Sequence, residues 1–416
     1  MNYRMGKAAA GDKVARQHGA MEYTEAPVDL NVVRRYRLER LRSEMRKRDV
    51  AGLLLFDQIN TRYATDATNM QVWCSHYETR CVFVALEGPV VLFDYANHPF
   101  LAEGLPTVDE YRVMPTFYYF ASGPYAEEDA KRFGDEIADL MRRHGGDNRR
   151  IGVDRLSHLG IDGLRANQLE VLDALPITEH ARVIKSPEEI ALMRASLAVC
   201  EAGCRAMQDA LQPGITENAL WAKLHATNIS LGGEWIETRL LSSGPRTNPW
   251  FRECSMRKIE AGELVCFDTD LIGPYGYCSD ISRSWLSSGK PTAEQRRLYA
   301  TAYEQIQHNM SILKPGMSFR ETSEKSWPIP QEFLANRYSS MIHGVGLADE
   351  YPGIKYWPDF DDRGYDGVLE PGMTLCVESY TGSDRGGEGV KLEEQVLITD
   401  TGVEVLSKYP FEKELL

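Results

Sequence analysis

The sequence predicts two domains: an α/β layer domain over residues 29–181 and an α+β domain over residues 182–416, after a polar extension of residues 1–28. Short apolar strands alternate with helices in the first region, which is typical of an α/β layer. A helix-start signal at Ser186 marks the boundary, and acidic residues interrupt apolar strands in the second region. A chain of 416 residues is also too long for one ordinary core.

Composition narrows the functional classes. The net charge of −14 argues against sequence-independent binding to nucleic acid or to an anionic membrane. Eight cysteines are scattered without a CxxC pair, which is typical of a reduced compartment. No stretch has the apolar length of a signal peptide or a transmembrane span. We therefore expect a cytoplasmic protein.

The first domain begins with a helix over residues 29–48, whose dense basic face we expect to be solvated rather than bound to an anionic partner. Apolar runs then predict strands, and Glu87-Gly88-Pro89 supplies a turn. The remaining predicted elements are strands at 52–56, 82–86, 90–93 and 150–154 and helices at 126–144 and 161–174.

The second domain opens with a capping box. Ser186 is the N-cap, Pro187 the first helical residue and Glu189 the partner three residues on. The helix is predicted to run through Ala210, and a second helix follows Thr216. Beyond these we expect strands over 240–285, a helix over 292–312 and strands over 371–400.

Three aspartates, Asp268, Asp270 and Asp280, fall in one predicted hairpin over residues 265–285, with its turn near 273–275. Side chains alternate along a strand, so the first two point the same way, and the returning strand brings Asp280 across from Asp268. Half-buried like charges are unfavourable unless a cation lies between them. A metal site and a solvated acidic face are both open interpretations of the hairpin alone.

Three further residues are candidate ligands. His343 follows an apolar approach and precedes glycines, Glu378 ends an apolar strand, and Glu393 interrupts another. Each also has an ordinary interpretation, as a satisfied polar histidine or as a glutamate on a strand edge.

The combination resembles a known fold. The order Asp, Asp, His, Glu, Glu, together with RVIKSPEEIALMR, EPGM and KLEEQVLIT, resembles the pita-bread fold of methionine aminopeptidases, Xaa-Pro peptidases and creatinases over residues 182–416. The resemblance implies an α+β pita-bread catalytic domain after a smaller creatinase/prolidase-like α/β domain. It implies two metal ions held by Asp268, Asp270, Asp280, His343, Glu378 and Glu393.

This ligand set is hard and oxygen-rich, which favours Fe or Mn, as divalent or mixed-valence ions. Five ionised carboxylates carry about −5 against +4 from two divalent ions. An anionic substrate group would therefore need further positive charge or an Fe(III) ion. The identity of the metal is open.

The chain departs from the peptidases in its histidines. After residue 181 it contains only His225, His308 and His343, and the first two fall in predicted helices. The segment SGPRTNPWF lacks the first proton-handling histidine of the peptidases, and Asp349 in HGVGLADEYP stands where they carry another. Amide hydrolysis needs a group of near-neutral pKa, whereas an ionised carboxylate serves better as a one-way base.

These departures resemble the DddP-type dimethylsulfoniopropionate (DMSP) lyases, as do FDTDLIGPYGY, RYSSMIHGVGLADEYP, LSKYPF and FDQINTRYATDATNMQVW. The resemblance implies a metal-dependent enzyme that cleaves a small organosulfur substrate, DMSP, to dimethyl sulfide and acrylate by α-proton abstraction and β-elimination. Asp349 matches the proposed base. The resemblance also implies a homodimer.

Aromatic faces bind onium groups, so tryptophan and tyrosine side chains are candidates for contact with the sulfonium. We select Tyr338, Trp73 and Trp250, with Tyr77 and Tyr351 also available. Ordinary packing is the alternative for each of them.

Three other functions are considered. A Xaa-Pro dipeptidase-like or aminopeptidase-like metallohydrolase is disfavoured by the missing histidines. A non-catalytic pita-bread binding module is disfavoured by the full ligand set. A lyase acting on a related β-substituted acid or onium compound shares every predicted ligand, so only the pocket distinguishes it.

Overall fold

The computed structural model describes residues 2–4 and 27–416, and the chain folds as two compact units, Met1–Arg182 and Val183–Leu416. The predicted extension of residues 1–28 lies almost wholly outside the described residues. Within the described ranges, no helix combines the length and the apolar character that a membrane crossing requires.

The first unit is built on a seven-stranded mixed sheet in the order β1-β5-β4-β3-β2-β6-β7. β2 pairs antiparallel with β3 and parallel with β6, so the sheet combines a meander with βαβ connections. Its strands are β1 (Asn2–Arg4), β2 (Gly52–Leu55), β3 (Cys81–Ala85), β4 (Val90–Asp94), β5 (Glu110–Val113), β6 (Arg150–Val153) and β7 (Glu170–Asp173).

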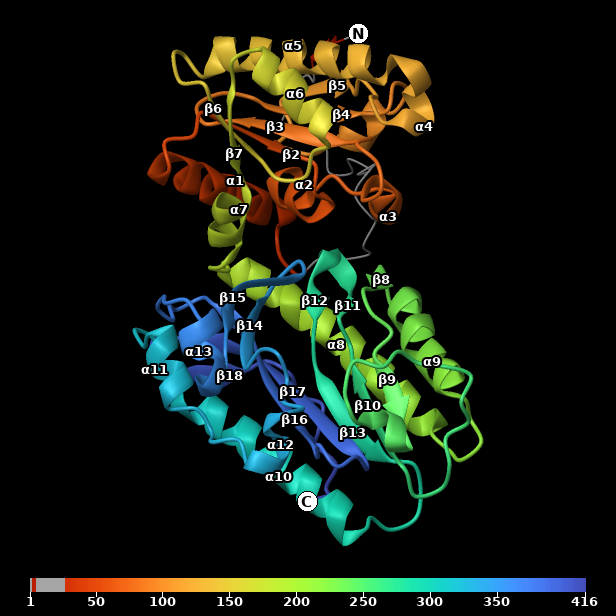
Figure 1. Ribbon diagram of the computed structural model, residues 1–416. Coiled ribbons are helices and arrows are strands. Elements are labelled where there is room, and N and C mark those ends of the chain that lie inside the picture. Colours follow the sequence, from red (N-terminus) through yellow and green to blue (C-terminus); the bar gives the residue numbers. More distant parts are fainter. Residues whose placement is uncertain (1, 5–26) are drawn as a thin grey trace. The chain divides into compact units, whose positions relative to one another are not determined.

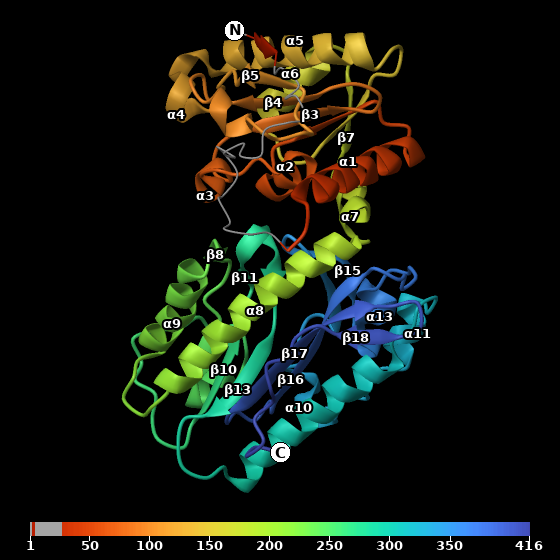
Figure 2. The same cartoon turned by 180° about the vertical axis from the view of Figure 1, so that it is seen from behind.

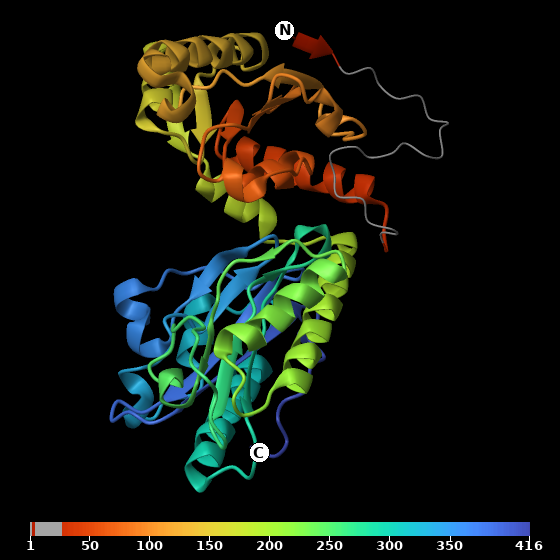
Figure 3. The ribbon, with the colours of Figure 1, turned by 90° about the vertical axis from the view of Figure 1, so that its right-hand side faces the viewer.

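Helices cover both faces of this sheet, with α5 and α6 on one face and α1 and α2 on the other (Figures 1 and 3). On the first face, Leu54 and Phe83 of the sheet pack with Phe133, Ile137 and Met141 of α5 in one hydrophobic core. The helices are α1 (Leu30–Lys47), α2 (Gln58–Thr65), α3 (Gln71–Cys74), α4 (Tyr119–Ser122), α5 (Ala126–His144), α6 (His158–Ala166) and α7 (Leu175–Arg182).

Two expectations for this unit are wrong. The basic face of α1 is not simply solvated, because Arg34 and Arg37 are 2% exposed and Arg34 pairs with Asp66 at 2.7 Å. The helix predicted over 161–174 ends at Ala166, and β7 follows. The hydrophobic pattern did not distinguish the end of α6 from β7, because short apolar runs fit a helix or a strand equally well.

The second unit contains a sheet of order β15-β14-β16-β17-β18 and two three-stranded sheets, β13-β10-β9 and β12-β11-β8. β10 and β13 lie against β17, which joins the hairpin to the larger sheet. The strands are β8 (Trp235–Ile236), β9 (Leu241–Ser243), β10 (Leu264–Asp268), β11 (Leu271–Ile272), β12 (Cys278–Ser279), β13 (Ser282–Leu286), β14 (Ile342–Val345), β15 (Asp349–Ile354), β16 (Thr374–Gly382), β17 (Gly389–Ile398) and β18 (Val403–Val405).

Helices flank these strands on both sides. Figures 1 and 2 show α8 and α9 beside the β10–β13 strands and α10 along β16 and β17. Tyr299 and Ile306 of α10 pack with Val377 and Leu392 in the main core of the unit. The helices are α8 (Pro187–Ala210), α9 (Glu217–Ser230), α10 (Ala293–Ile312), α11 (Phe319–Glu324), α12 (Gln331–Leu334) and α13 (Trp357–Arg363).

The aspartate hairpin forms, but with a different register from the one expected. Asp268 pairs with Ser282 rather than with Asp280. The strand breaks after β10 because Asp270 adopts φ = 34°, a left-handed conformation, before β11 pairs with β12. The backbone N–H of Asp270 then donates to Asp280 Oδ1 at 3.3 Å. The three carboxylates therefore meet at a break in the hairpin, and not on one regular strand face.

The capping box at Ser186 supports a testable prediction. Ser186 Oγ accepts from Glu189 N at 3.2 Å, and Glu189 Oε2 accepts from Ser186 N at 3.0 Å. Loss of an N-cap hydroxyl costs about 1 kcal/mol. Ser186→Ala should therefore lower the free energy of urea unfolding by about 1 kcal/mol.

Ser311→Ala is a matched control, because this exposed hydroxyl donates only to the His308 carbonyl of its own helix, at 2.7 Å. Equal unfolding midpoints for Ser186→Ala and Ser311→Ala would show that the box does not stabilise α8.

Candidate metal centre

The six predicted ligands come from four strands and the hairpin break, and the structure brings them together. His343 lies on β14, Glu378 on β16 and Glu393 on β17, with Glu378 and Glu393 directly opposite each other in the β16/β17 register. Their donor atoms form three groups, each within 4.8 Å: Asp280, His343, Cys376 and Glu393; Asp268, Glu378 and Glu393; and Asp268, Asp270 and Asp280.

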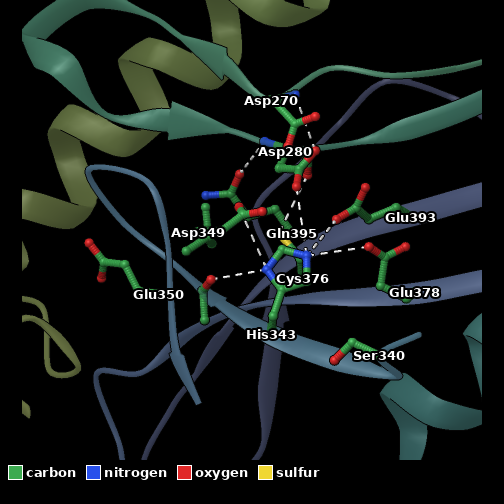
Figure 4. Close-up of polar contacts among 12 residues, drawn as sticks. Asp270, Asp280, Ser340, His343, Asp349, Glu350, Cys376, Glu378, Glu393 and Gln395 are labelled. Atoms are coloured by element: carbon green, nitrogen blue, oxygen red, sulfur yellow. Dashed lines mark hydrogen bonds and ion pairs between the residues drawn. The ribbon is translucent and has the colours of Figure 1, made fainter. Parts of the chain in front are cut away.

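The His343 ring directs Nε2 toward three of the candidate ligand carboxylates. Its Nδ1 donates to the Gly344 carbonyl at 3.0 Å, a contact that leaves Nε2 to face the carboxylates. Nε2 lies 3.3 Å from Glu378 Oε1, 3.5 Å from Glu393 Oε1 and 3.7 Å from Asp280 Oδ2 (Figure 4). Nε2 therefore needs a proton or a cation between it and these oxygens.

Burial sets the electrostatics of the cluster. It raises the pKa of Asp268 and of Asp280 well above the ordinary value, and neighbouring carboxylates add to the effect. Burial also raises the pKa of Asp270 to about 6. Burial opposes a charge on His343, yet Asp349, Glu378 and Glu393 raise its pKa well above the ordinary value. The site thus attracts positive charge strongly.

The donor set fits metal ions. Glu393 Oε1 is buried and accepts no hydrogen bond in the part of the chain that the structure describes. An orphaned carboxylate oxygen beside an imidazole nitrogen is the arrangement expected where a cation binds. Two of the three donor groups share Glu393, and two share Asp268, so the cluster suits neighbouring ions rather than one isolated ion.

Lys391 is the site residue that the sequence analysis missed. Its Nζ is fully buried and contacts Glu378 directly, Ser282 Oγ at 2.7 Å, Asp268 Oδ2 at 3.2 Å and Glu393 Oε2 at 3.5 Å. These three carboxylates form one of the donor groups, so the Lys391 ammonium supplies positive charge to every member of that group. The available signal was its place in KLEEQ, two residues before Glu393 on the same face of β17.

Lys391 changes the charge balance. Five carboxylates with one ammonium carry about four negative charges, which two divalent ions would neutralise. The excess negative charge expected from the ligands alone is therefore met by this side chain.

Cys376 joins one geometric group but is a poor ligand. Burial raises the pKa of its thiol well above the ordinary value, and Glu393 and Asp280 reinforce this. A thiol binds metal as the thiolate. Cys376 is thus better explained as a packing residue on β16.

Two of the predicted aromatic residues lie near the centre. The Lys391 ammonium is 4.6 Å from the Tyr338 ring centroid and 5.9 Å from the Trp250 ring. Tyr338 also stacks on Phe251 at 5.2 Å. The Lys391 ammonium therefore already occupies part of the ring surface of Tyr338 and Trp250 that a sulfonium could contact.

The other aromatic candidates are placed differently. Trp73 belongs to the first unit, where it packs with Tyr77 at 4.9 Å and with Phe120 at 6.3 Å. Tyr351 stacks on Tyr365 at 5.7 Å.

Asp349 lies at the start of β15, next to His343. Its Oδ1 is 3.7 Å from His343 Nδ1, and the side chain is 51% exposed. Partial burial raises the pKa of Asp349 to about 6, with Asp270 and Glu393 adding to burial and His343 opposing. It is an accessible carboxylate with a greater proton affinity than an ordinary aspartate.

Neither of the other histidines of the second unit reaches the centre. His225 lies on α9 against Trp221, and His308 lies on α10, where its Nε2 contacts the Lys325 carbonyl at 2.9 Å. Between residues 183 and 416, all of them described, His343 is therefore the single imidazole at the cluster.

Comparison with known proteins agrees with this architecture. Residues 191–400 match metallopeptidase family M24, and residues 37–184 match the creatinase/prolidase N-terminal domain. The Xaa-Pro dipeptidase from Bacillus anthracis superposes with a TM-score of 0.73 at 21% identity, covering 90% of this chain and 98% of that chain. The chain belongs to metallopeptidase family M24, and the predicted pita-bread fold with a creatinase-like first domain is confirmed.

Within that family the chain is similar to a group that is not named for peptide cleavage. It is 45% identical over 394 residues to the dimethylsulfoniopropionate lyase DddP of Roseovarius nubinhibens and 44% identical over 395 residues to that of Roseobacter denitrificans. Each match covers 93% of this chain and 88% of the relative. The predicted resemblance to DddP-type lyases is confirmed.

Metal binding should stabilise the protein. A ligand at about 1,000 times its Kd adds about 4 kcal/mol to the unfolding free energy. Metal-free protein titrated with Mn²⁺ should therefore show a rising thermal midpoint by calorimetry. Glu393→Gln should lose most of this rise, because Glu393 belongs to two of the three donor groups.

Asp384→Asn serves as the control, since this side chain is 53% exposed and belongs to none of the donor groups. An equal Mn²⁺-dependent rise in Glu393→Gln and Asp384→Asn would exclude Glu393 as a ligand.

Proposed function

We propose that this protein is a metal-dependent DMSP lyase that releases dimethyl sulfide and acrylate. Identity of 45% to a DddP lyase over 93% of the chain supports this activity. The single observation in the site that carries the proposal is Asp349 beside a cluster with one histidine, because elimination needs a base and no proton shuttle to an amine.

Asp268, Asp270, Asp280, His343, Glu378 and Glu393 would hold two metal ions, for which an oxygen-rich set favours Fe or Mn. When bound, the ions would supply positive charge opposite the substrate carboxylate and the negative charge that develops beside it. Lys391 adds a fixed positive charge to the same region.

The reaction follows from the residues around the cluster. Asp349 takes the proton from the α-carbon of DMSP. The electrons of that C–H bond form the double bond of acrylate, and those of the C–S bond leave with sulfur. The positive sulfonium thus becomes neutral dimethyl sulfide. The proton remains on Asp349, whose 51% exposed side chain returns it to water.

Tyr338 and Trp250 are proposed to line the path of the sulfonium. Trp73, in the first unit, remains a predicted sulfonium contact. For Tyr338 and Trp250 the nearby Lys391 ammonium makes part of each ring unfavourable for a second cation. A sulfonium would therefore contact these rings away from Lys391.

Cytoplasmic location and a homodimer complete the proposal. All eight cysteines are free and buried, which suits a reduced compartment. The first unit exposes aromatic side chains at Tyr119 (78%), Phe120 (72%) and Tyr125 (66%), and such patches commonly mark contact surfaces.

The activity is tested by headspace analysis. Metal-loaded protein should release dimethyl sulfide from DMSP, with equimolar acrylate. Asp349→Asn should lower kcat by about 10²–10⁴-fold while its metal content stays unchanged, because it removes the base but not a ligand.

Asp384→Asn should retain full activity. Pure metal-loaded protein that yields no dimethyl sulfide would reject the lyase assignment, and cleavage of Xaa-Pro dipeptides by the same preparation would favour a metallohydrolase.

The charge balance gives a second test. Lys391→Met leaves the occupied centre about one charge more negative, so it should bind the anionic carboxylate of DMSP less well. We expect KM to rise about tenfold, equivalent to about 1.4 kcal/mol. Lys391→Arg keeps the charge and should raise KM less. If Lys391→Met and wild type have equal KM, the charge of Lys391 does not act on the substrate.

A further inference from the structure

Two segments of the second unit that lie far apart in the sequence meet in the structure through an ion pair outside the proposed metal ligands. Lys185, from RVIKSPEE, lies 2.9 Å through its Nζ from Oε2 of Glu350, from HGVGLADEYP. The two side chains are 3% and 1% exposed. A buried ion pair is costly to form unless its geometry is closely held, so it often serves specificity rather than stability.

Glu350 organises the turn between β14 and β15. Its Oε1 accepts from the backbone N–H of Leu347 at 3.0 Å. A Cβ on Gly346 would lie 2.5 Å from Glu350 Oε2, so the chain can approach the carboxylate this closely only with glycine there. The turn is therefore wrapped around the Glu350 carboxylate.

Lys185 is itself held in place. Its backbone N–H donates to the Gly372 carbonyl in the EPGM turn at 2.9 Å. Gly372 adopts φ = 90°, and a Cβ there would meet Ile184 at 2.9 Å. Ser186 then caps α8. The backbone of Lys185 is therefore held by the contact with Gly372 and by the start of α8, which fixes the point from which its side chain extends.

Asp349, in contrast, is poorly held through its own side chain. In the region from residue 27 to residue 416, no donor hydrogen-bonds to its carboxylate, and His343 Nδ1 at 3.7 Å is its one ion-pair partner. Successive side chains of a strand point to opposite sides, and Figure 4 shows Asp349 toward the His343 ring and Glu350 away from it. The position of Asp349 therefore depends on the backbone that Glu350 anchors.

We infer that Lys185 and Glu350 form a positioning pair that holds Asp349 over the reacting carbon. The role rests on the proposed function, in which Asp349 is the base. The pair acts through the backbone of residues 349 and 350 and touches neither substrate nor metal.

The test uses full-length, metal-loaded protein with DMSP and with DMSP deuterated at the α-carbon. Lys185→Met and Glu350→Gln should each lower kcat about a hundredfold, the scale expected for a displaced base, with a smaller change in KM. The α-deuterium isotope effect on kcat should increase, because proton removal becomes more rate-limiting. Metal content should equal that of wild type.

A double variant separates positioning from folding. Lys185→Met with Glu350→Met replaces the ion pair by apolar side chains, a change that often preserves or increases stability. We expect it to recover the thermal midpoint lost in the single variants but to remain slow, because a methionine at position 350 offers no acceptor to the backbone N–H of Leu347 and the turn loses that anchor. Lys185→Arg should retain most of the rate, and Arg194→Met, which breaks the exposed pair with Glu404, should leave kcat unchanged.

The inference is overturned if the double variant recovers kcat together with stability, or if the single variants are slow without any increase in the isotope effect. If wild-type protein releases no dimethyl sulfide, the proposed function fails and this role fails with it. If wild type is active and the single variants match it, only the positioning role fails.

Discussion

Mutual repulsion among buried carboxylates is the constraint on which the second unit depends. Asp268, Asp280, Glu378 and Glu393 are each at most 2% exposed, in a region where water cannot screen them. Carboxylates that repel one another stay close only where the surrounding structure holds them in place. Asp268 lies on β10, Glu378 on β16 and Glu393 on β17, whereas Asp280 lies between β12 and β13. The main core of α10 against β16 and β17 supports the two longer strands.

The protein meets part of this repulsion with its own chain. Lys391 lies among three of the carboxylates, and the remaining excess corresponds to two divalent ions. The same ammonium lies near Tyr338 and Trp250, so one side chain links charge balance in the centre to the aromatic wall proposed for the sulfonium. In the proposed function, Lys391 would therefore couple metal binding to substrate selection.

The chemistry proposed for this protein depends on the residues at the cluster, and not on the fold alone. Solved Xaa-Pro dipeptidases have the same fold, with a TM-score of 0.73 at 21% identity, so the fold alone does not select a reaction. Two local features of this chain favour the proposed chemistry: one imidazole lies at the cluster, and a half-exposed carboxylate, Asp349, lies beside it. A carboxylate base without a histidine shuttle suits proton removal and loss of a stable leaving group.

Much of this architecture could be predicted from the sequence. The helix boundaries at Ser186 and Ala210 are local features, which capping and spacing rules predict. The candidate ligands and the missing histidines followed instead from the resemblance of local motifs to a known family. Tertiary structure alone decided the rest. The break at Asp270, the Lys391 ammonium among the carboxylates and the contact of Lys185 with Glu350 depend on which distant segments meet. Lys185 and Glu350 are 165 residues apart, and no local pattern encodes a pairing made by packing across that separation.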